Sequence, residues 1–170
     1  MARDEEYMLM ALEEAASAAE LGEIPVGAVV VDKDGPVLAR THNLCETNRM
    51  PTDHAELLGV RAACEWLNTW RLSDCTVYVT LEPCPMCMGA SLNARVDKVY
   101  FGAYEQKGRS LTGELAKANL LNHKTEVAGG VLGEECSALL SSFFISMRQK
   151  QKEEKERKKA GADNFSCEEI

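Results

Sequence analysis

The sequence predicts a layered α/β domain whose sheet is at least partly parallel. Short runs of β-branched residues alternate along the chain with stretches in which apolar residues recur every three or four positions, as strands alternate with helices. The length of 170 residues matches one domain, and 45% apolar residues are enough to bury an ordinary core. We therefore expect one domain in residues 1–159 and a disordered tail in residues 160–170.

A helix and a hairpin are expected first along the chain. Residues 4–21 carry apolar side chains at helical spacing with acids between them, and Gly22 closes the run. Residues 26–31 form a nearly continuous run of β-branched side chains, and residues 32–35 (DKDG) after it are typical of a turn. Residues 37–40 resume the strand pattern, so a hairpin is the simplest interpretation.

A second helix is expected after the polar stretch 42–50. Thr52 or Asp53 could cap this helix, which would run to about Leu67 and place His54 and Glu56 in its first turn. Residues 76–80 (TVYVT) predict a strand. Residues 85–93 predict a short helix with proline near its start, where the missing N–H costs least.

The C-terminal third predicts two more strands and a long helix. The strands cover residues 98–101 and 125–128 with a polar stretch at 102–122 between them, and the helix runs from about residue 134 toward 159. Its end, residues 148–159, holds seven Lys or Arg against three Glu. This segment is either a solvated helix with Glu–Lys pairs or a contact for RNA. The total net charge of −8 disfavours nucleic-acid binding by the rest of the chain, because phosphates attract a positive surface.

The first residues lack the features of a secretion signal. Acids interrupt every apolar run there, and no later stretch reaches membrane-spanning length, so we expect a cytoplasmic protein without a membrane anchor. Seven cysteines are an odd number in such a chain, which favours thiols and metal ligands over a disulfide framework. The two at positions 84 and 87 have the spacing of metal ligands.

Two short motifs carry the chemistry, His54-Ala55-Glu56 and residues 83–87 (PCPMC), and each precedes or begins an expected helix. A helix start favours ionised thiols, so Cys84 and Cys87 could both bind one tetrahedral ion. A catalytic zinc site needs three protein ligands, an open position for water and a carboxylate that is not a ligand. The pattern therefore predicts a zinc site in which His54, Cys84 and Cys87 hold the metal and Glu56 moves protons.

These motifs match the H-x-E and P-C-x-x-C signature of zinc-dependent nucleobase deaminases. The similarity extends over residues 5–159 through IPVGAVVVD, HN, HAE, RLSDCTVYVTLEPCPMCMGA, ARVDKVYFGA, LNHKTEVAGGVLGEECSALLSSFF and the Lys/Arg-rich end. Over this length the chain resembles the bacterial tRNA-specific adenosine deaminases of the cytidine/deoxycytidylate deaminase superfamily. The resemblance implies a three-layer α/β/α fold with a mixed five-stranded central sheet, a homodimer with one Zn²⁺ per subunit, and a tRNA anticodon stem-loop as partner.

The resemblance also implies the reaction, which converts adenosine to inosine at the wobble position 34 of tRNA. Zinc would lower the pKa of a water molecule, the resulting hydroxide would attack an amidine carbon, and Glu56 would carry its proton to the ring nitrogen and then to the departing ammonia. The family's nucleoside contacts fall on Asn43, on Pro25 and Val26 as pocket wall, and on the backbone of Ala55. Phe144 would belong to the helix that faces the tRNA.

Two departures from the family leave alternatives open. Asp53 stands where the family commonly has a small residue, and the 102–122 segment is shortened, with Glu105 in place of the usual Asp. These changes and the acidic body motivate an alternative substrate, a free nucleobase or nucleoside of the guanine or cytosine type. A third hypothesis is a non-catalytic, zinc-stabilised RNA-binding module, which would need a fourth ligand such as Cys75, His42 or Asp53.

Overall fold

The computed structural model describes residues 2–105, 112–118 and 123–163. The helices are α1 (Ala2–Glu20), α2 (Cys45–Asn48), α3 (Ala55–Leu67), α4 (Pro85–Asn93), α5 (Thr112–Lys117) and α6 (Gly133–Asp163). The strands are β1 (Gly27–Val31), β2 (Val37–His42), β3 (Thr76–Leu81), β4 (Lys98–Ala103) and β5 (Glu126–Gly129). All the strands and long helices that the sequence predicts are therefore present.

The five strands form one mixed sheet in the order β2-β1-β3-β4-β5. The hairpin strands β1 and β2 are antiparallel, as is the pair of β1 with β3. β3, β4 and β5 run parallel to one another. Parallel neighbours need a crossover connection, and the α4 segment provides it between β3 and β4.

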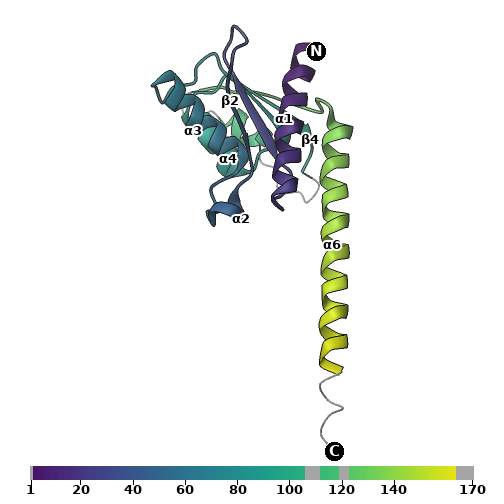
Figure 1. Ribbon diagram of the computed structural model, residues 1–170. Helices are drawn as coiled ribbons and strands as arrows, with labels where there is room; N and C mark the ends of the chain where they lie inside the picture. Colours follow the sequence, from purple (N-terminus) through teal and green to yellow (C-terminus); the bar gives the residue numbers. More distant parts are fainter. Residues whose placement is uncertain (1, 106–111, 119–122, 164–170) are drawn as a thin grey trace, which may run out of the picture.

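Helices cover both faces of this sheet (Figure 1). α1 packs on β1, β2 and β3, and α6 packs on β4 and β3. On the other side, α3 packs on the hairpin strands, α4 lies against α3 and α5, and α5 contacts β5. The predicted three-layer α/β/α fold of the cytidine-deaminase type is confirmed.

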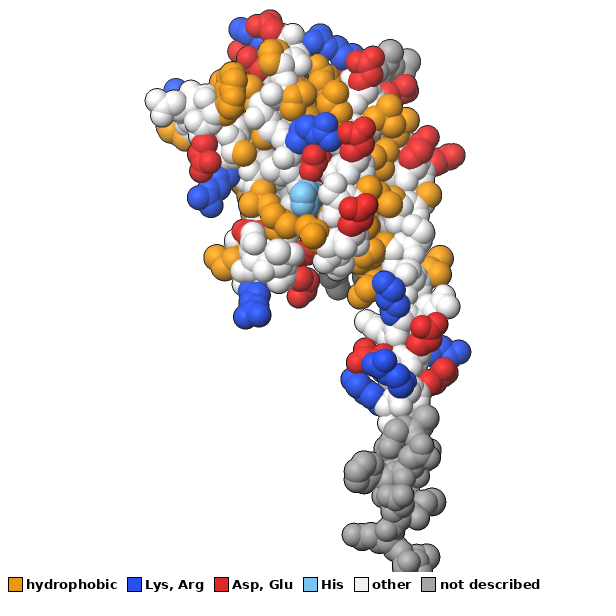
Figure 2. Space-filling view, viewed as in Figure 1, with side chains coloured by type: hydrophobic (Ala, Val, Ile, Leu, Met, Phe, Trp, Pro, Cys, Tyr) orange, Lys and Arg blue, Asp and Glu red, His pale blue; other side chains and the backbone are white. Residues whose placement is uncertain are grey.

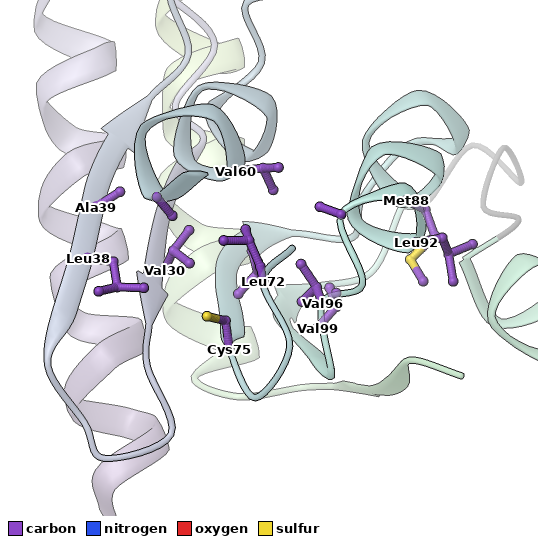
Figure 3. Packing of buried hydrophobic residues seen from close by; sticks show 13 residues of the cluster. Val30, Leu38, Ala39, Val60, Leu72, Cys75, Met88, Leu92, Val96 and Val99 are labelled. Carbon is purple, nitrogen blue, oxygen red and sulfur yellow. The ribbon is translucent and has the colours of Figure 1, made fainter. Parts of the chain in front are cut away.

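One apolar core lies between the sheet and the layer of α3 and α4. Figure 3 shows Val30 of β1, Val60 of α3 and Val99 of β4 among its members, with Leu72 and Val96 from the loops that precede β3 and β4. A second core lies on the opposite face, between the sheet and the layer of α1 and α6. Burial on both faces explains why β1 reads as a continuous apolar run instead of an alternating one.

The structure corrects the expected start of the second long helix. Its N-cap is His54, in an extended conformation without a capping side-chain bond, so neither Thr52 nor Asp53 caps it. The Asp53 carboxylate instead accepts a hydrogen bond from the Asn48 side chain at 2.8 Å. Two short helices, α2 and α5, also lie within stretches that the sequence marked only as polar.

α6 begins on the sheet and projects well beyond the domain (Figure 1). Figure 2 shows Lys/Arg and Asp/Glu side chains interspersed over the projecting part, and the pairs Glu154–Lys158 and Lys152–Glu156 are i,i+4 ion pairs. α6 reaches Asp163, four residues into the expected tail, while residues 164–170 lie outside the described residues. None of the described helices has the length and apolar character needed to cross a bilayer.

Gly27 allows α1 to lie unusually close to the sheet. A Cβ atom added at this position of β1 would overlap the Ala11 carbonyl oxygen and lie 2.5 Å from the Ala15 nitrogen and 2.8 Å from the Glu14 Cβ. Two of these atoms are helix backbone, which cannot rotate away as the end of a side chain can. Glycine is required here because a side chain would not fit between β1 and α1. The backbone conformation at this position does not itself require glycine.

We expect Gly27→Ala to lower the free energy of unfolding by about 1–3 kcal/mol, because α1 must move away from β1. Urea unfolding followed by circular dichroism measures the change. Gly113→Ala in α5 is the matched control, since an added Cβ there meets nothing within 4 Å. That control should be neutral or stabilising by up to about 1 kcal/mol, because alanine favours helix over glycine. Equal midpoints for the two variants would contradict the close-approach argument.

Candidate functional site

The predicted site residues converge at the sheet edge where β3 and β4 end. Residues 82–84 follow β3 directly and lead into α4. Gly27 at the start of β1 pairs with His42 at the end of β2, so Val26 and Asn43 lie at the same edge. The Asn43 backbone N–H donates to the Val26 carbonyl at 3.0 Å, which continues the strand pairing into the site.

α3 begins at this edge as well. The Thr41 hydroxyl, near the end of β2, donates a hydrogen bond of 2.7 Å to the Ala55 carbonyl in the first turn of α3. This bond ties the helix start, and with it His54 and Glu56, to the hairpin. The first turns of α3 and α4 are thereby held against the same end of the sheet.

The side chains of His54, Cys84 and Cys87 form one group. The two sulfurs lie 3.5 Å apart, and the His54 Nδ1 atom lies 3.7 Å from the Cys84 sulfur and 3.5 Å from the Cys87 sulfur. His54 is the N-cap of α3, Cys84 is the N-cap of α4 and Cys87 lies in the first turn of α4. Within the described part of the chain, no fourth His, Cys or carboxylate atom joins this group, so Cys75, His42 and Asp53 are not part of it.

Their surroundings favour a thiolate. The pKa of Cys84 is lowered to about 4, chiefly because of the hydrogen bond that it shares with Cys87, and its interaction with His54 lowers the pKa further. The same bond to Cys84, together with burial, raises the pKa of Cys87. The pKa of His54 is raised by its interaction with Cys84. Cys84 is thus the first of the pair to lose its proton, and the start of α4 stabilises the resulting charge.

The group fits a zinc ion. Zinc binds thiolate sulfur at about 2.3 Å and imidazole nitrogen at about 2.0–2.1 Å, so tetrahedral angles separate two sulfurs by about 3.8 Å and sulfur from nitrogen by about 3.6 Å. The observed separations of 3.5–3.7 Å agree with these values. Two cysteines and one histidine are also donors that zinc prefers. Three protein ligands leave the fourth position of such an ion to water or substrate.

Glu56 lies beside this group as a buried carboxyl. Its side chain is 4% exposed and lies in the first turn of α3, within hydrogen-bonding reach of Cys87. Burial raises the pKa of Glu56, because an apolar environment disfavours the charged form. A raised pKa makes the carboxylate a stronger base toward a proton donor such as water. This is the property that general acid–base chemistry requires.

A pocket of about 510 Å³ opens over these residues. This volume suits a nucleoside-sized ligand. Among the described residues, its walls carry five glutamates and neither lysine nor arginine. The lining residues are Glu23, Ile24, Val26, Asn43, Cys45, Glu46, Pro51, His54, Glu56, Leu81, Glu82, Pro83, Cys84, Pro85 and Glu105.

The other residues that the sequence singled out divide into two sets. Val26 and Asn43 line the pocket, and both are mostly buried. Pro25 and Ala55 are buried next to lining residues without lining the pocket themselves. Phe144 lies on α6, is 41% exposed and is not in the pocket wall.

Glu23 is the pocket residue that sequence reasoning missed. It is 1% exposed and stands in the turn between α1 and β1, where a single glutamate in a polar connection carries no periodic signal. Only its contacts with the distant segment after β2 reveal that it is buried. Cys45 and Glu82 join the pocket wall in the same way, through tertiary contacts.

A second pocket, of about 420 Å³, lies at the opposite edge of the sheet and contains none of these residues. Its aromatic wall consists of Tyr7, Tyr78 and Tyr100. Their hydroxyls donate to the Gly35 carbonyl at 2.8 Å, to Asp4 at 2.7 Å and to Glu126 at 2.7 Å. The three tyrosine hydroxyls therefore bind to groups of the protein itself, and we interpret this pocket as part of the structural hydrogen-bond network.

The sequence matches the model of the MafB19-like deaminase family over residues 2–161. The tRNA-specific adenosine deaminase of Bacillus subtilis is 49% identical over 154 residues, which cover 89% of this chain and 95% of that protein. The tRNA-specific adenosine deaminase of Haemophilus influenzae is 43% identical, with 89% of each chain covered.

Solved structures of deaminases are also similar to this chain. A structure from a study of A-to-I editing by tRNA:A34 deaminases at the wobble position superposes with a TM-score of 0.72, at 38% identity, over 79% of this chain and 98% of that one. The guanine deaminase of Bacillus subtilis superposes with a TM-score of 0.56, at 39% identity, over 59% of this chain and 64% of that one.

We expect the protein to bind one zinc per chain and Cys84→Ala to weaken zinc binding by more than about 100-fold. Loss of a residue that only hydrogen-bonds to a ligand typically weakens metal binding by about 10–100-fold, and loss of the ligand itself should cost more. Metal analysis after dialysis measures the zinc content. Cys45→Ala is the control, since this thiol lines the same pocket outside the ligand group. A chelator should lower the melting temperature of the wild type and leave that of Cys84→Ala unchanged. Full zinc content in Cys84→Ala would refute the ligand assignment.

Proposed function

The chain belongs to the deaminase family that includes the tRNA-specific adenosine deaminases, and we propose that it converts adenosine to inosine at position 34 of a tRNA anticodon. The observation that carries the proposal is the pocket, which holds the ligand group His54, Cys84 and Cys87 together with the buried carboxyl of Glu56. Identities of 49% and 43% to two tRNA-specific enzymes, each over 89% of this chain, support the RNA substrate.

In this proposal, His54, Cys84 and Cys87 hold one zinc ion per subunit. When bound, zinc supplies the Lewis acidity that brings the pKa of a water molecule toward neutrality. The remaining steps fall to residues of the chain itself.

Glu56 carries the protons. Its carboxylate takes a proton from the water that attacks C6 of adenine and delivers that proton to N1 as the C6–O bond forms. It then transfers the second proton of the water oxygen to the amino group. The C6–N bond breaks, ammonia leaves and the base becomes hypoxanthine. Burial suits Glu56 to this work, because a raised pKa makes its carboxylate a stronger base toward the proton of the water.

Positioning falls to the pocket wall. We assign Asn43 as a polar contact to the flipped nucleoside, Val26 and Pro25 as the wall beside it, and the Ala55 backbone as a contact to the base. The anticodon stem-loop then lies outside the pocket, against the side of α6 that carries Phe144. The proposal includes a homodimer that acts in the cytoplasm.

The alternative substrate is a free base of the guanine type, because a guanine deaminase is among the similar structures. That similarity spans 64% of the guanine deaminase chain, whereas the match to the Bacillus subtilis tRNA-specific enzyme spans 95% of its length. The pocket does not separate the two substrates by charge, because both place a neutral base in it.

We expect the zinc-loaded protein to release ammonia from an anticodon stem-loop with adenosine at position 34 and to leave inosine there. Ammonia release and nucleoside analysis of the RNA measure the reaction. Guanine, cytosine, adenosine and the same stem-loop with guanosine at position 34 serve as matched controls and should remain unchanged. Turnover of a free base with the stem-loop untouched would replace the proposal with the alternative.

We expect Glu56→Ala to retain one zinc per chain and to lower kcat by about 10³-fold or more, because the proton transfers lose their carrier. Zinc analysis and stem-loop turnover test the two halves of this expectation. The control is Glu65→Ala on the same helix, because Glu65 is exposed and pairs with Arg61 at the surface. A Glu56→Ala protein with full zinc and near wild-type kcat would exclude the proton-carrier role.

A further inference from the structure

Glu23 is a buried carboxylate for which the proposed chemistry has no use. It follows Gly22, whose φ of +81° lets the chain turn sharply out of α1. Its side chain is 1% exposed and lies in the pocket wall. A charged group is not retained in such a place unless hydrogen bonds replace its water, so its partners are informative.

Those partners all come from one segment, residues 43–47. One carboxylate oxygen, Oε1, accepts the backbone N–H of Thr47 at 2.6 Å, and the other, Oε2, accepts the side-chain amide of Asn43 at 3.1 Å. Burial opposes ionisation, but these donors together with the N–H of Glu46 lower the pKa of Glu23 below its usual value. Glu23 therefore faces Asn43 as an anion at neutral pH.

An ionised carboxylate fixes the orientation of the amide that it meets. It can only accept hydrogen bonds, so the NH₂ group of Asn43 must face Glu23. The amide oxygen of Asn43 then lies on the other side, where the Cys45 thiol donates to it at 3.5 Å. With the opposite orientation, the amide oxygen would face a negative charge in a buried setting, and two hydrogen-bond acceptors would be left facing each other without a donor between them.

We propose that Glu23 is a positioning residue for the nucleoside: it holds the side-chain amide of Asn43 in one orientation at the pocket wall. The proposal rests on the proposed function, because Asn43 matters for turnover only if it contacts the substrate. The role is specific to Glu23 among the wall carboxylates of this region, since Glu46 is exposed and shows no hydrogen bond to Asn43.

Glu23 also supports the short helix α2, and this second role must be separated from the first. The N-cap of α2, Leu44, makes no side-chain hydrogen bond, and the Glu23 carboxylate takes over by accepting the Thr47 N–H in the first turn. Losing Glu23 therefore costs some stability whatever its effect on Asn43. Stability alone does not test the proposal.

The test combines a double-mutant cycle with a spectroscopic readout. Glu23→Gln keeps the size of the side chain but leaves one acceptor oxygen for two donors. The Thr47 N–H is backbone and cannot rotate away, so we expect the oxygen to stay on it and the new NH₂ group to face that of Asn43. Asn43→Ala and the double variant complete the cycle. Glu20→Gln is the control for removing one negative charge, since Glu20 is exposed at the end of α1, three residues before Glu23, and does not line the pocket. Stem-loop turnover gives kcat and KM, and metal analysis gives the zinc content. NMR follows the side-chain amide protons of Asn43, whose signals are identified because they disappear in Asn43→Ala.

We expect Glu23→Gln to lower kcat/KM by about 10–100-fold with zinc retained, and to change kcat and KM in the same proportion as Asn43→Ala. The double variant should be no slower than Asn43→Ala within about 2-fold, because both changes remove one interaction. Glu20→Gln should stay within about 2-fold of the wild type. Losses that multiply in the double variant would overturn the proposal, because Glu23 would then act independently of Asn43.

The NMR readout distinguishes failure of this proposal from failure of the proposed function. In the wild type, one amide proton of Asn43 should exchange slowly with solvent. Glu23→Gln should shift and broaden that signal, whereas Glu20→Gln should not. If the wild type leaves the stem-loop unchanged, the function fails while these signals still decide the role of Glu23. If Glu23→Gln does not fold, fast exchange of both Asn43 protons in the wild type is the result that refutes the proposal.

Discussion

The site depends on two helices that begin at the same edge of one sheet. β3 and β4 are parallel, so the chain must cross over between them through α4, and the start of α4 falls at the end of β3. α3 reaches the same edge because its first turn is bonded to the end of β2. His54 and Cys84 occupy the N-caps of these helices without making capping bonds. Each helix therefore gives up the stabilisation of a capping side chain, and the two freed side chains meet within 3.7 Å.

Two buried glutamates in the pocket show how hydrogen-bond donors decide the state of a carboxyl. Glu56 is buried with few donors, so the cost of desolvation dominates and its pKa rises. Glu23 is buried among several donors from residues 43–47, so the anion is satisfied and its pKa falls. One site thus contains a carboxyl suited to exchanging protons and another suited to holding a fixed charge. Both carboxyls are buried, and their pKa values shift in opposite directions because more N–H donors surround Glu23 than Glu56.

Charge is distributed unevenly between the pocket and the last helix. The described pocket wall holds five glutamates, which disfavours phosphate inside it, while Lys and Arg are concentrated in the last part of α6. A neutral base can enter an acidic pocket, whereas the phosphates of an RNA must be held elsewhere. The basic residues of α6 also pair with glutamates one turn away. The sequence is therefore compatible with two interpretations of this segment, a solvated helix and a contact for RNA.

The fold class, the strands and long helices, and the ligand motif could be predicted from the sequence, because periodicity and short-range spacing are local properties of a chain. His54, Glu56, Cys84 and Cys87 could be named in this way since each lies in a motif of five residues or fewer. The cap of α3 was misassigned and α2 and α5 were missed, because contacts with other segments decide such short features. Only the tertiary structure placed Glu23 against Asn43, 20 residues further along the chain, because no local pattern records which distant donors will surround a buried charge.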